Sequence, residues 1–216
     1  MPADPPDGWT PEGGGLPARP PHQPLFSPIR QRVLLRGTVD GWVPTGRVDM
    51  ARLIAWLAAR KPILAVPRRL RRAAPKGVDV LVHASDGMMP FRRDQRELST
   101  ALRRLVGVAE VRVWWFRSDP AELWDARVEA EDAYRPHSGR PTLILSDGVL
   151  PSADHERAAA AWSDLGVRLR AAGSEAALLT PYGEATPAAA AAGLVTIAWD
   201  RGTTLRMIRR ARRRRR

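Results

Sequence analysis

The stretch VDVLVHASDGMMPF, residues 78–91, decides how this sequence folds. Its first five residues are apolar apart from Asp79, which is typical of a buried strand. Small and polar residues follow directly, from His83 to Gly87. Open α/β sheets bind their ligands at the carboxyl ends of the strands. The stretch therefore predicts a strand whose end carries a metal, a catalytic group or the remnant of such a site.

Strands and amphipathic helices alternate after this stretch. Helices are expected over 92–107, capped by Asp94, and over 152–173, while further strands are expected at 110–116, 141–146, 175–180 and 194–199. The remaining segments, 117–140 with a short helix around Leu123 and Trp124 and the low-complexity 181–193, are connectors. The alternation predicts an α/β fold with a doubly wound, mostly parallel Rossmann-like sheet and helices on both faces.

The chain divides into four parts by composition. Residues 1–28 are rich in Pro and Gly and are expected to be disordered, and 29–77 form an N-terminal extension with a short helix and a basic linker. Residues 78–200 form the α/β domain, and 201–216 form an Arg-rich tail. Within the extension, 31–46 predicts an extended pair with a turn near Asp40, followed by a helix that Asp49 caps.

Most of the positive charge lies outside the predicted domain. The formal net charge is +12, from 35 basic and 23 acidic residues. Residues 206–216 contain eight arginines and no acid, so without them 27 basic residues face 23 acidic ones. Another five basic residues lie in the linker 68–76. The folded part is therefore close to neutral, and a basic run of this kind is usually a solvated appendage or a polyanion-binding segment.

Several classes of protein are excluded or disfavoured by composition. The chain has no cysteine, which excludes disulfides, thiolate metal sites and cysteine nucleophiles. The N-terminus lacks the basic and apolar regions of a signal peptide, and no apolar run reaches the length of a membrane span. We expect a soluble, cytoplasmic protein without a membrane span.

Two strand ends, LVHASDGMM at 81–89 and LILSDGVLP at 143–151, together resemble those of the von Willebrand factor A family. The resemblance implies a doubly wound fold in which a D-x-S-x-S motif and a later Asp-Gly pair bind a divalent cation. In this sequence His83 stands where the family has Asp, Ser85 matches the first Ser, and Gly87 replaces the second. Asp147 matches the acidic position of the later strand.

These departures predict a degenerate, metal-free site. A magnesium-type ion takes about six oxygen ligands, usually with one or two carboxylates. His83 removes a carboxylate and Gly87 removes a hydroxyl, so His83, Ser85, Gly87 and Asp147 are vestigial site positions. Asp86, one residue away, is a minor alternative ligand.

The run from 45 to 95 resembles, more narrowly, the A-like domains of bacterial proteins found with MoxR-type AAA+ ATPases. That resemblance implies a non-enzymatic adaptor that binds a protein partner, either such an ATPase or a gene-neighbour effector. No cofactor and no catalytic residue is expected. The candidate partner-binding residues at the strand ends are Asp86, Met88, Met89, Phe91 and Asp147.

Two other functions stay open. His83, Ser85 and Asp147 could form a hydrolase triad, although HASDG lacks the first glycine of a nucleophile elbow. Alternatively, the protein binds nucleic acid through its tail. Trp114 and Trp115 would suit base stacking, but only Arg112 and Arg117 lie near them in the sequence.

The tail itself is expected to bind polyanions without sequence preference and to be dispensable for folding. Met207 and Ile208 could anchor its first turn, whereas the arginines beyond them should stay solvated. These candidate polyanion-binding residues are Arg209, Arg210, Arg212, Arg213, Arg214, Arg215 and Arg216.

Overall fold

A six-stranded sheet forms the centre of the protein, in the order β5-β4-β3-β6-β7-β8. The computed structural model describes residues 22–43, 46–69, 71–73, 75, 77–125, 134–137, 139–150, 155–183 and 186–214. Five strands run parallel: β4 (Val111–Phe116), β3 (Val78–His83), β6 (Thr142–Leu145), β7 (Ala176–Thr180) and β8 (Val195–Ala198). The short β5 (Trp124–Asp125) pairs antiparallel with β4.

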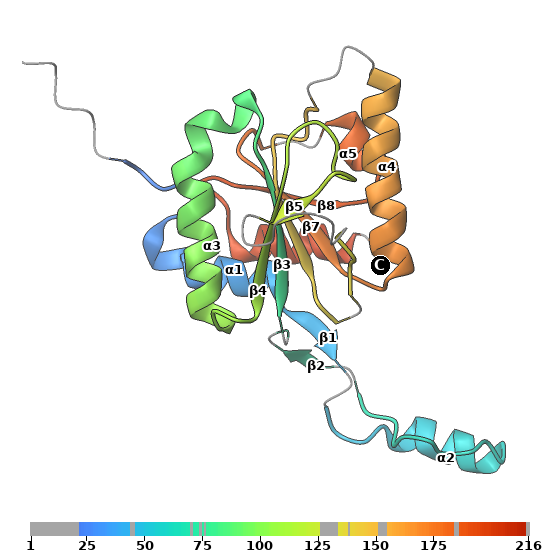
Figure 1. Cartoon of the computed structure of the whole chain (residues 1–216). Coiled ribbons are helices and arrows are strands. Elements are labelled where there is room, and N and C mark those ends of the chain that lie inside the picture. The colour runs from blue at the N-terminus through green and yellow to red at the C-terminus, as the bar shows by residue number, and fades with distance from the viewer. Residues whose placement is uncertain are drawn as a thin grey trace, which may run out of the picture.

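Helices cover both faces of this sheet, as Figure 1 shows. The first face packs against α1 (Pro28–Val39), α3 (Arg92–Val106) and α6 (Leu205–Arg213). The second face packs against α4 (His155–Ala171) and α5 (Pro187–Ala191). All six residues of β3 are buried, because this central strand has neighbours on both edges and both faces. The predicted doubly wound α/β fold is confirmed.

The predicted strands and long helices form within a few residues of their expected bounds, but Asp94 does not cap α3. The helix begins at Arg92, directly after a 3₁₀ turn, η1 (Asp86–Phe91), which includes Pro90. Asp94 is buried in the first turn of α3, where its carboxylate accepts a hydrogen bond from the backbone N–H of Leu25 (2.8 Å). Asp94 therefore fastens the segment before α1 to α3.

The extended pair predicted for 31–46 is wrong, since most of this stretch is helix α1. Ser27 precedes the helix and Pro28 occupies its first turn, where proline is favoured. Leu34, Leu35 and Val39 are buried on its inner side, at helical rather than alternating spacing. Gly37 lies so close to α6 that a Cβ atom there would lie 2.5 Å from a methyl group of Leu205. A glycine that weakens the helical pattern in the sequence thus permits close packing.

An arm projects from the body between α1 and β3 (Figure 1). Its base is an antiparallel ribbon of β1 (Gly41–Val43) and β2 (Arg71–Ala73), and its end carries α2 (Met50–Ala58). We call residues 46–69, which lie beyond this ribbon, the arm. Asp49 caps α2 as predicted, accepting from the Arg52 N–H at 3.2 Å. The chain then returns alongside, with hydrogen bonds from Asp49 N–H to Pro67 O and from Arg69 N–H to Arg47 O (both 2.8 Å).

The two connectors contain short elements of their own. The helix expected around Leu123 and Trp124 is wrong, since Leu123 belongs to no helix and Trp124 lies in strand β5 and pairs with Trp115. Within 181–193, α5 forms a five-residue helix that Thr186 caps through the Ala189 N–H. Ala192, which follows the helix, lies directly against Gly166 of α4, and Ala189 and Ala192 both belong to the core on the second face of the sheet.

The amino end of the sheet contains a buried ion cluster. Asp79, fully buried in β3, accepts two hydrogen bonds from Arg112 of β4 (2.8 and 2.6 Å) and one from Arg140 (3.3 Å). Nearby, the Tyr134 hydroxyl lies 2.9 Å from the Thr142 hydroxyl. Burial raises the pKa of Tyr134 well above its usual value of about 10, so its phenol stays neutral at pH values where an exposed tyrosine ionises.

The tail is folded further than expected. Helix α6 runs to Arg213 and packs on α1 and β8. Its Ile208 is buried in the core on the first face of the sheet. Arg212 donates to the backbone carbonyls of Gly37 (3.0 Å) and Thr38 (2.9 Å) at the end of α1, and it pairs with Glu175. The expectation that every arginine beyond Ile208 stays solvated is wrong for Arg212. The predicted disorder of 1–28 falls mostly outside the described residues.

Candidate functional site at the switch point of the sheet

The strand order reverses between β3 and β6, which are adjacent in the sheet although two strands separate them in the chain. From β3 the chain proceeds outward through β4 and β5, and from β6 it proceeds outward on the other side. The crevice at such a switch point is the usual ligand site of doubly wound sheets. His83 ends β3 and Ser146-Asp147 follows β6, so the two predicted strand-end motifs lie together here.

His83 lies fully buried between the two strand ends. Its Nε2 donates to the backbone carbonyl of Arg117 at 2.8 Å, because a carbonyl oxygen can only accept. Its Nδ1 lies 3.1 Å from Asp147 Oδ1 and 2.9 Å from Ser146 Oγ. The ring stacks on Phe116 with centroids 4.6 Å apart and planes 6° from parallel. Both nitrogens and one ring face are therefore engaged within the protein.

Hydrogen bonds also fix the Asp147 carboxylate and the turn that follows it. Its Oδ1 accepts the backbone N–H of Val149 at 3.1 Å, and Ser146 Oγ accepts the N–H of Gly148 at 2.9 Å. Gly148 has φ +78, a left-handed conformation that glycine adopts without strain. Its carbonyl accepts hydrogen bonds from the Trp162 indole N–H (3.1 Å) and the Thr186 hydroxyl (2.9 Å). The turn after β6 is thus fixed by contacts from two helices.

Gly87 is required by the position of Asp147. A Cβ atom on Gly87 would lie 2.5 Å from Asp147 Oδ2, closer than real Cβ atoms approach an oxygen. A serine at this position, as the family pattern has, would displace the Asp147 carboxylate. Both residues therefore accommodate Asp147: His83 binds one side of the carboxylate, and Gly87 makes room for the other.

The residues at this point do not fit a magnesium-type ion. Such an ion needs several oxygen ligands in near-octahedral array, whereas here one carboxylate faces an imidazole ring and its Oδ1 already accepts a backbone hydrogen bond. Ser85 Oγ lies 3.4 Å from His83 Nδ1, on the same small cluster. Among the described residues, no three His, Asp or Glu side chains converge in a group that could hold a metal. The imidazole of His83 thus faces the carboxylate that an ion would need.

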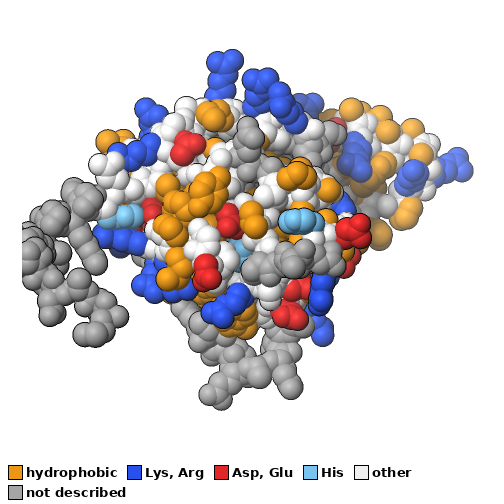
Figure 2. Space-filling model, turned by 90° about the horizontal axis from the view of Figure 1, so that it is seen from above, with side chains coloured by type: hydrophobic (Ala, Val, Ile, Leu, Met, Phe, Trp, Pro, Cys, Tyr) orange, Lys and Arg blue, Asp and Glu red, His pale blue; other side chains and the backbone are white. Residues whose placement is uncertain are grey.

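The surface around the switch point, which we call the rim, carries exposed apolar side chains. Figure 2 shows hydrophobic side chains interspersed with acidic ones at the centre of this end of the molecule. Met89 is 49% exposed and Asp86 is exposed, so both candidate residues lie on the surface. Phe91 is half-buried and packs edge-on against Tyr182, with ring centroids 5.7 Å apart. Met88 lies in the core on the first face of the sheet and Asp147 is buried, so neither of these two candidate side chains lies on the surface.

Tyr182 is a rim residue that the sequence did not reveal. It follows β7, whose carboxyl end lies beside that of β6, and its hydroxyl reaches the carbonyl of Gly87 at 3.5 Å. The position of Tyr182 directly after a strand could have indicated this, because residues that follow parallel strands lie at this end of the sheet. The sequence PYG after 176–180 marks such a strand end, although it also suits a connector.

The candidate polyanion-binding residues lie on a different part of the molecule. Arg209, Arg210, Arg213 and Arg214 are exposed on α6, whereas Arg212 is engaged by α1 and Glu175. Arg215 and Arg216 lie outside the described residues. No helix of the described residues is both long and apolar enough to cross a membrane.

The fold and the site define an α/β protein with a five-strand parallel sheet, in the order 2-1-3-4-5, and helices packed on both faces. No family model, no curated protein and no solved structure matches the chain.

Proposed function

We propose that this protein is a non-enzymatic, von Willebrand factor A-like interaction module of the bacterial cytoplasm. It binds a protein partner, either a MoxR-type AAA+ ATPase or a neighbouring effector protein of a multi-component system. The family assignment is supported by the two strand-end motifs, which lie side by side at the switch point. The single observation that carries the binding role is the apolar surface of helix α2.

Helix α2 presents its apolar side chains to solvent. Met50, Ile54 and Leu57 are exposed and Leu53 is half-buried, and each of the nine residues of α2 is exposed or half-buried. These four side chains have the i, i+3, i+4, i+7 spacing with which a helix lies in a groove of a partner protein. A helix of this length is marginal in water without tertiary packing. The surface of α2 therefore suits a bound partner.

The rest of the arm indicates the chemistry of that partner. The returning segment adds exposed apolar side chains, including Leu64 at 93% exposure. The arm also carries six exposed basic residues: Arg47, Arg52, Arg60, Lys61, Arg68 and Arg69. Asp49 is the single acidic residue between residues 46 and 69. A partner groove with an apolar floor and acidic margins complements this arm. Two copies of the arm would repel each other, and a nine-residue helix buries far less than the roughly 800 Å² per partner of a stable dimer.

The rim around the switch point supplies a second contact surface in this proposal. Met89, Tyr182 and Val149 are exposed there, close to Asp86. The arm and the rim lie at opposite ends of the sheet in Figure 1, because the arm joins the body where β3 begins. A module with two such surfaces can bridge two proteins, which is what an adaptor does.

The site geometry supports a non-enzymatic role over the hydrolase alternative. A general base must reach the proton that it removes from a nucleophile or water. His83 is fully buried, its Nε2 is bound to the Arg117 carbonyl, and its Nδ1 is bound within the Asp147 cluster. Ser146, the hydroxyl closest to this ring, is also fully buried.

The proposal is tested by isolating the partner and then measuring its binding. The full chain is immobilised and exposed to a lysate of its host, retained proteins are identified by mass spectrometry, and the leading one is purified. Calorimetric titration then compares the wild type with Ile54→Asp and Met89→Asp. We expect Ile54→Asp to weaken binding at least tenfold, because a carboxylate would enter the apolar groove.

Val167→Asp is the matched control, since Val167 is a similarly exposed apolar residue on α4. It should bind the partner as the wild type does. If neither Ile54→Asp nor Met89→Asp changes the affinity for any purified candidate, the interaction role at these surfaces is wrong.

Nucleic-acid binding through the tail is the second candidate function. The observation in its favour is that α6 exposes Arg206, Arg209, Arg210, Arg213 and Arg214 along one short helix. With Arg215 and Arg216, seven arginines are candidates, and at 0.7–0.9 per phosphate contact they give a log–log salt slope of about −5 to −6. Filter binding between low and physiological salt measures this slope, and salt-insensitive binding would exclude the tail as its source.

A further inference from the structure

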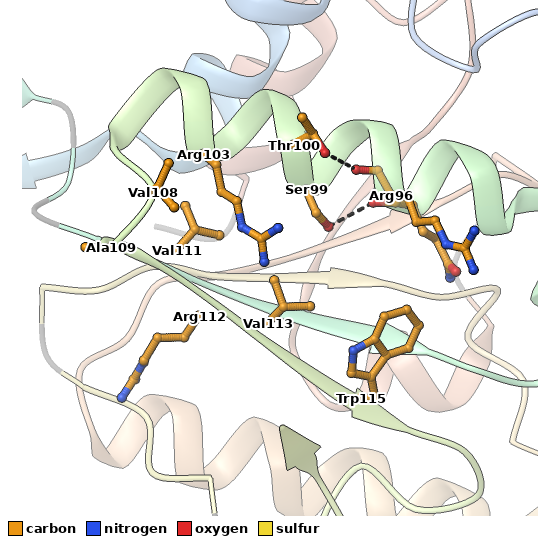
Figure 3. Close-up of a pocket in the computed structure, with 11 residues that line it drawn as sticks. Arg96, Ser99, Thr100, Arg103, Val108, Ala109, Val111, Arg112, Val113 and Trp115 are labelled. Atoms are coloured by element: carbon orange, nitrogen blue, oxygen red, sulfur yellow. Dashed lines mark hydrogen bonds between the residues drawn. The ribbon is translucent and has the colours of Figure 1, made fainter. Parts of the chain in front are cut away.

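A groove lies between helix α3 and strand β4, and it contains no residue of the arm and none of the named rim residues. It encloses about 460 Å³, and a neighbouring hollow of about 230 Å³ shares Arg96 and Trp115 with it. These volumes together fall in the range of small-ligand sites. In Figure 3, Val111, Val113 and Trp115 point from β4 toward α3, while Arg103 reaches down from the helix.

Two tryptophans line the groove and its neighbouring hollow. Trp115 and Trp124 are direct cross-strand partners of β4 and β5, and Trp124 is 46% exposed. Neither ring stacks on another aromatic ring within the described ranges. A base-stacking surface here would therefore consist of two indole rings, Trp115 of β4 and Trp124 of β5.

The cations come from α3 rather than from β4. Arg92, Arg96 and Arg103 line the groove or its hollow, and none of the three has an ion-pair partner in the described part of the chain. The described lining residues include no acid. Arg103 Nε is buried without a hydrogen-bond acceptor among the described residues, which leaves a guanidinium donor unused.

Gln95 adds an acceptor to these donors. Its Nε2 donates to the carbonyl of His83 at 3.0 Å, which fixes the orientation of the amide. The residue is 1% exposed, yet its Oε1 has no donor among the described residues. Gln95 lies about two turns, or roughly 12 Å, along α3 from Arg103. A ligand that suits both carries N–H donors at one end and negative charge at the other.

We propose that this groove binds nucleotides, with bases stacked on Trp115 and Trp124 and phosphates bound by Arg92, Arg96 and Arg103. Flat aromatic faces beside unpaired cations are what single-stranded nucleic-acid sites combine, and nucleobases supply the N–H donors that Gln95 requires. The ligand is a single strand or a free nucleotide. The groove lies apart from both surfaces of the proposed function, so either proposal can fail without the other.

Fluorescence anisotropy with labelled U₈ and A₈ RNA tests the groove in the full chain. The parent protein carries alanine at positions 206, 209, 210 and 213–216, which removes the seven candidate tail arginines but keeps Arg212 and its contacts. Trp124→Ala should weaken binding about fivefold or more, and Trp124→Phe should retain most of it, since stacking is preserved. Arg96→Ala should reduce the salt slope by about 0.7.

Arg104→Ala is the matched control, because Arg104 is an exposed arginine of α3 that lines neither hollow. Competition by millimolar UMP or AMP identifies free nucleotides as the ligand, and resistance to it identifies a strand. Circular dichroism melting shows whether Trp124→Ala folds, and Trp124→Phe with Arg96→Ala tests the groove if it does not. Equal binding by the parent, Trp124→Ala and Arg96→Ala would overturn the proposal, and so would equal displacement by polyglutamate.

Discussion

The imidazole of His83 and the carboxylate of Asp147 face each other across the switch point, with Nδ1 3.1 Å from Oδ1. Each side chain compensates for the burial of the other, and Gly87 leaves room for the second carboxylate oxygen. The site is therefore a closed polar cluster that stabilises the junction of β3 and β6. Its chemistry is internal to the fold, which is why we assign binding to other surfaces.

Substitution of His83 by aspartate should convert this cluster into an ion-dependent one. His83→Asp sets two buried carboxylates against each other, and we expect it to lower the free energy of unfolding by about 3 kcal/mol or more. Magnesium should recover about 1.4 kcal/mol at ten times its Kd. Thermal melting with and without millimolar Mg²⁺ measures both effects, with His83→Asn as the uncharged control. The wild type should not respond, and its stabilisation by Mg²⁺, abolished in Asp147→Ala, would contradict our interpretation of the site.

Alanine substitutions at two glycines with nearly the same φ angle should distinguish the cost of a left-handed backbone from the cost of steric contact with a neighbour. Gly148 has φ +78 and a Cβ there would lie 2.9 Å from Thr186 Oγ1, whereas Gly183 has φ +79 and open space around it. Both alanine variants carry the cost of a left-handed residue, about 1 kcal/mol. Urea denaturation should show a larger loss for Gly148→Ala than for Gly183→Ala. Equal losses would mean that Thr186 moves aside without cost.

The buried Asp79 should be more sensitive than a surface carboxylate. Asp79→Asn removes the charge that the partly exposed Arg112 and Arg140 share, and loss of their charge-assisted hydrogen bonds should cost about 1.5–3 kcal/mol. Glu97→Gln, which removes an exposed pair with Arg93 on α3, should cost no more than about 0.5 kcal/mol. Chemical denaturation of the two variants compares them directly. A similar loss for both would show that Arg112 and Arg140 find other acceptors when Asp79 is neutral.

Alkaline pH should destabilise the protein through Tyr134. Burial raises the pKa of its phenol in the folded state, so the unfolded chain loses this proton first as the pH rises through about 10. The stabilising contribution is therefore complete below pH 10 and is lost above it. Denaturation curves between pH 8 and 11 should fall less steeply for Tyr134→Phe than for the wild type. Parallel curves would show that Tyr134 does not cause the alkaline loss.

The arginines of α6 should divide into one structural residue and several dispensable ones. Arg212→Ala removes donors from the Gly37 and Thr38 carbonyls, and we expect a loss of about 1–3 kcal/mol. Arg209→Ala, on an exposed arginine, should stay within about 0.5 kcal/mol of the wild type. Deletion of 209–216 should therefore lower the melting temperature, contrary to the expectation from sequence. An unchanged melting temperature would restore that expectation.

Local patterns were sufficient for the sheet but not for everything packed on it. Strands β3 and β6 are short apolar runs followed by polar residues, so their position and the meeting of His83 with Asp147 follow from the sequence alone. Helix α1 could not be recognised in this way, because Gly37 and Thr38 weaken its helical propensity and it is stabilised by packing on α6, α3 and the sheet. Arg212 binds carbonyls 174 and 175 positions away, which no local pattern contains.

The nucleotide groove was hidden for a similar reason. Trp115 lies in a predicted strand, but Arg96 and Arg103 belong to the helix before it, and the fold brings them over the same face of β4. Trp124 joins them through an antiparallel pair whose second strand has two residues. Such a short strand leaves no periodicity to detect.

The exposure of α2 makes its backbone amides a direct measure of partner binding. A nine-residue helix without a single buried residue opens readily, so its amide hydrogens should exchange with deuterium almost as fast as those of an unfolded chain. The amides of β3, buried at the centre of the sheet, should exchange only when the whole protein unfolds. Slow exchange in residues 50–58 would report occupancy of the arm in any mixture, even before the partner is identified.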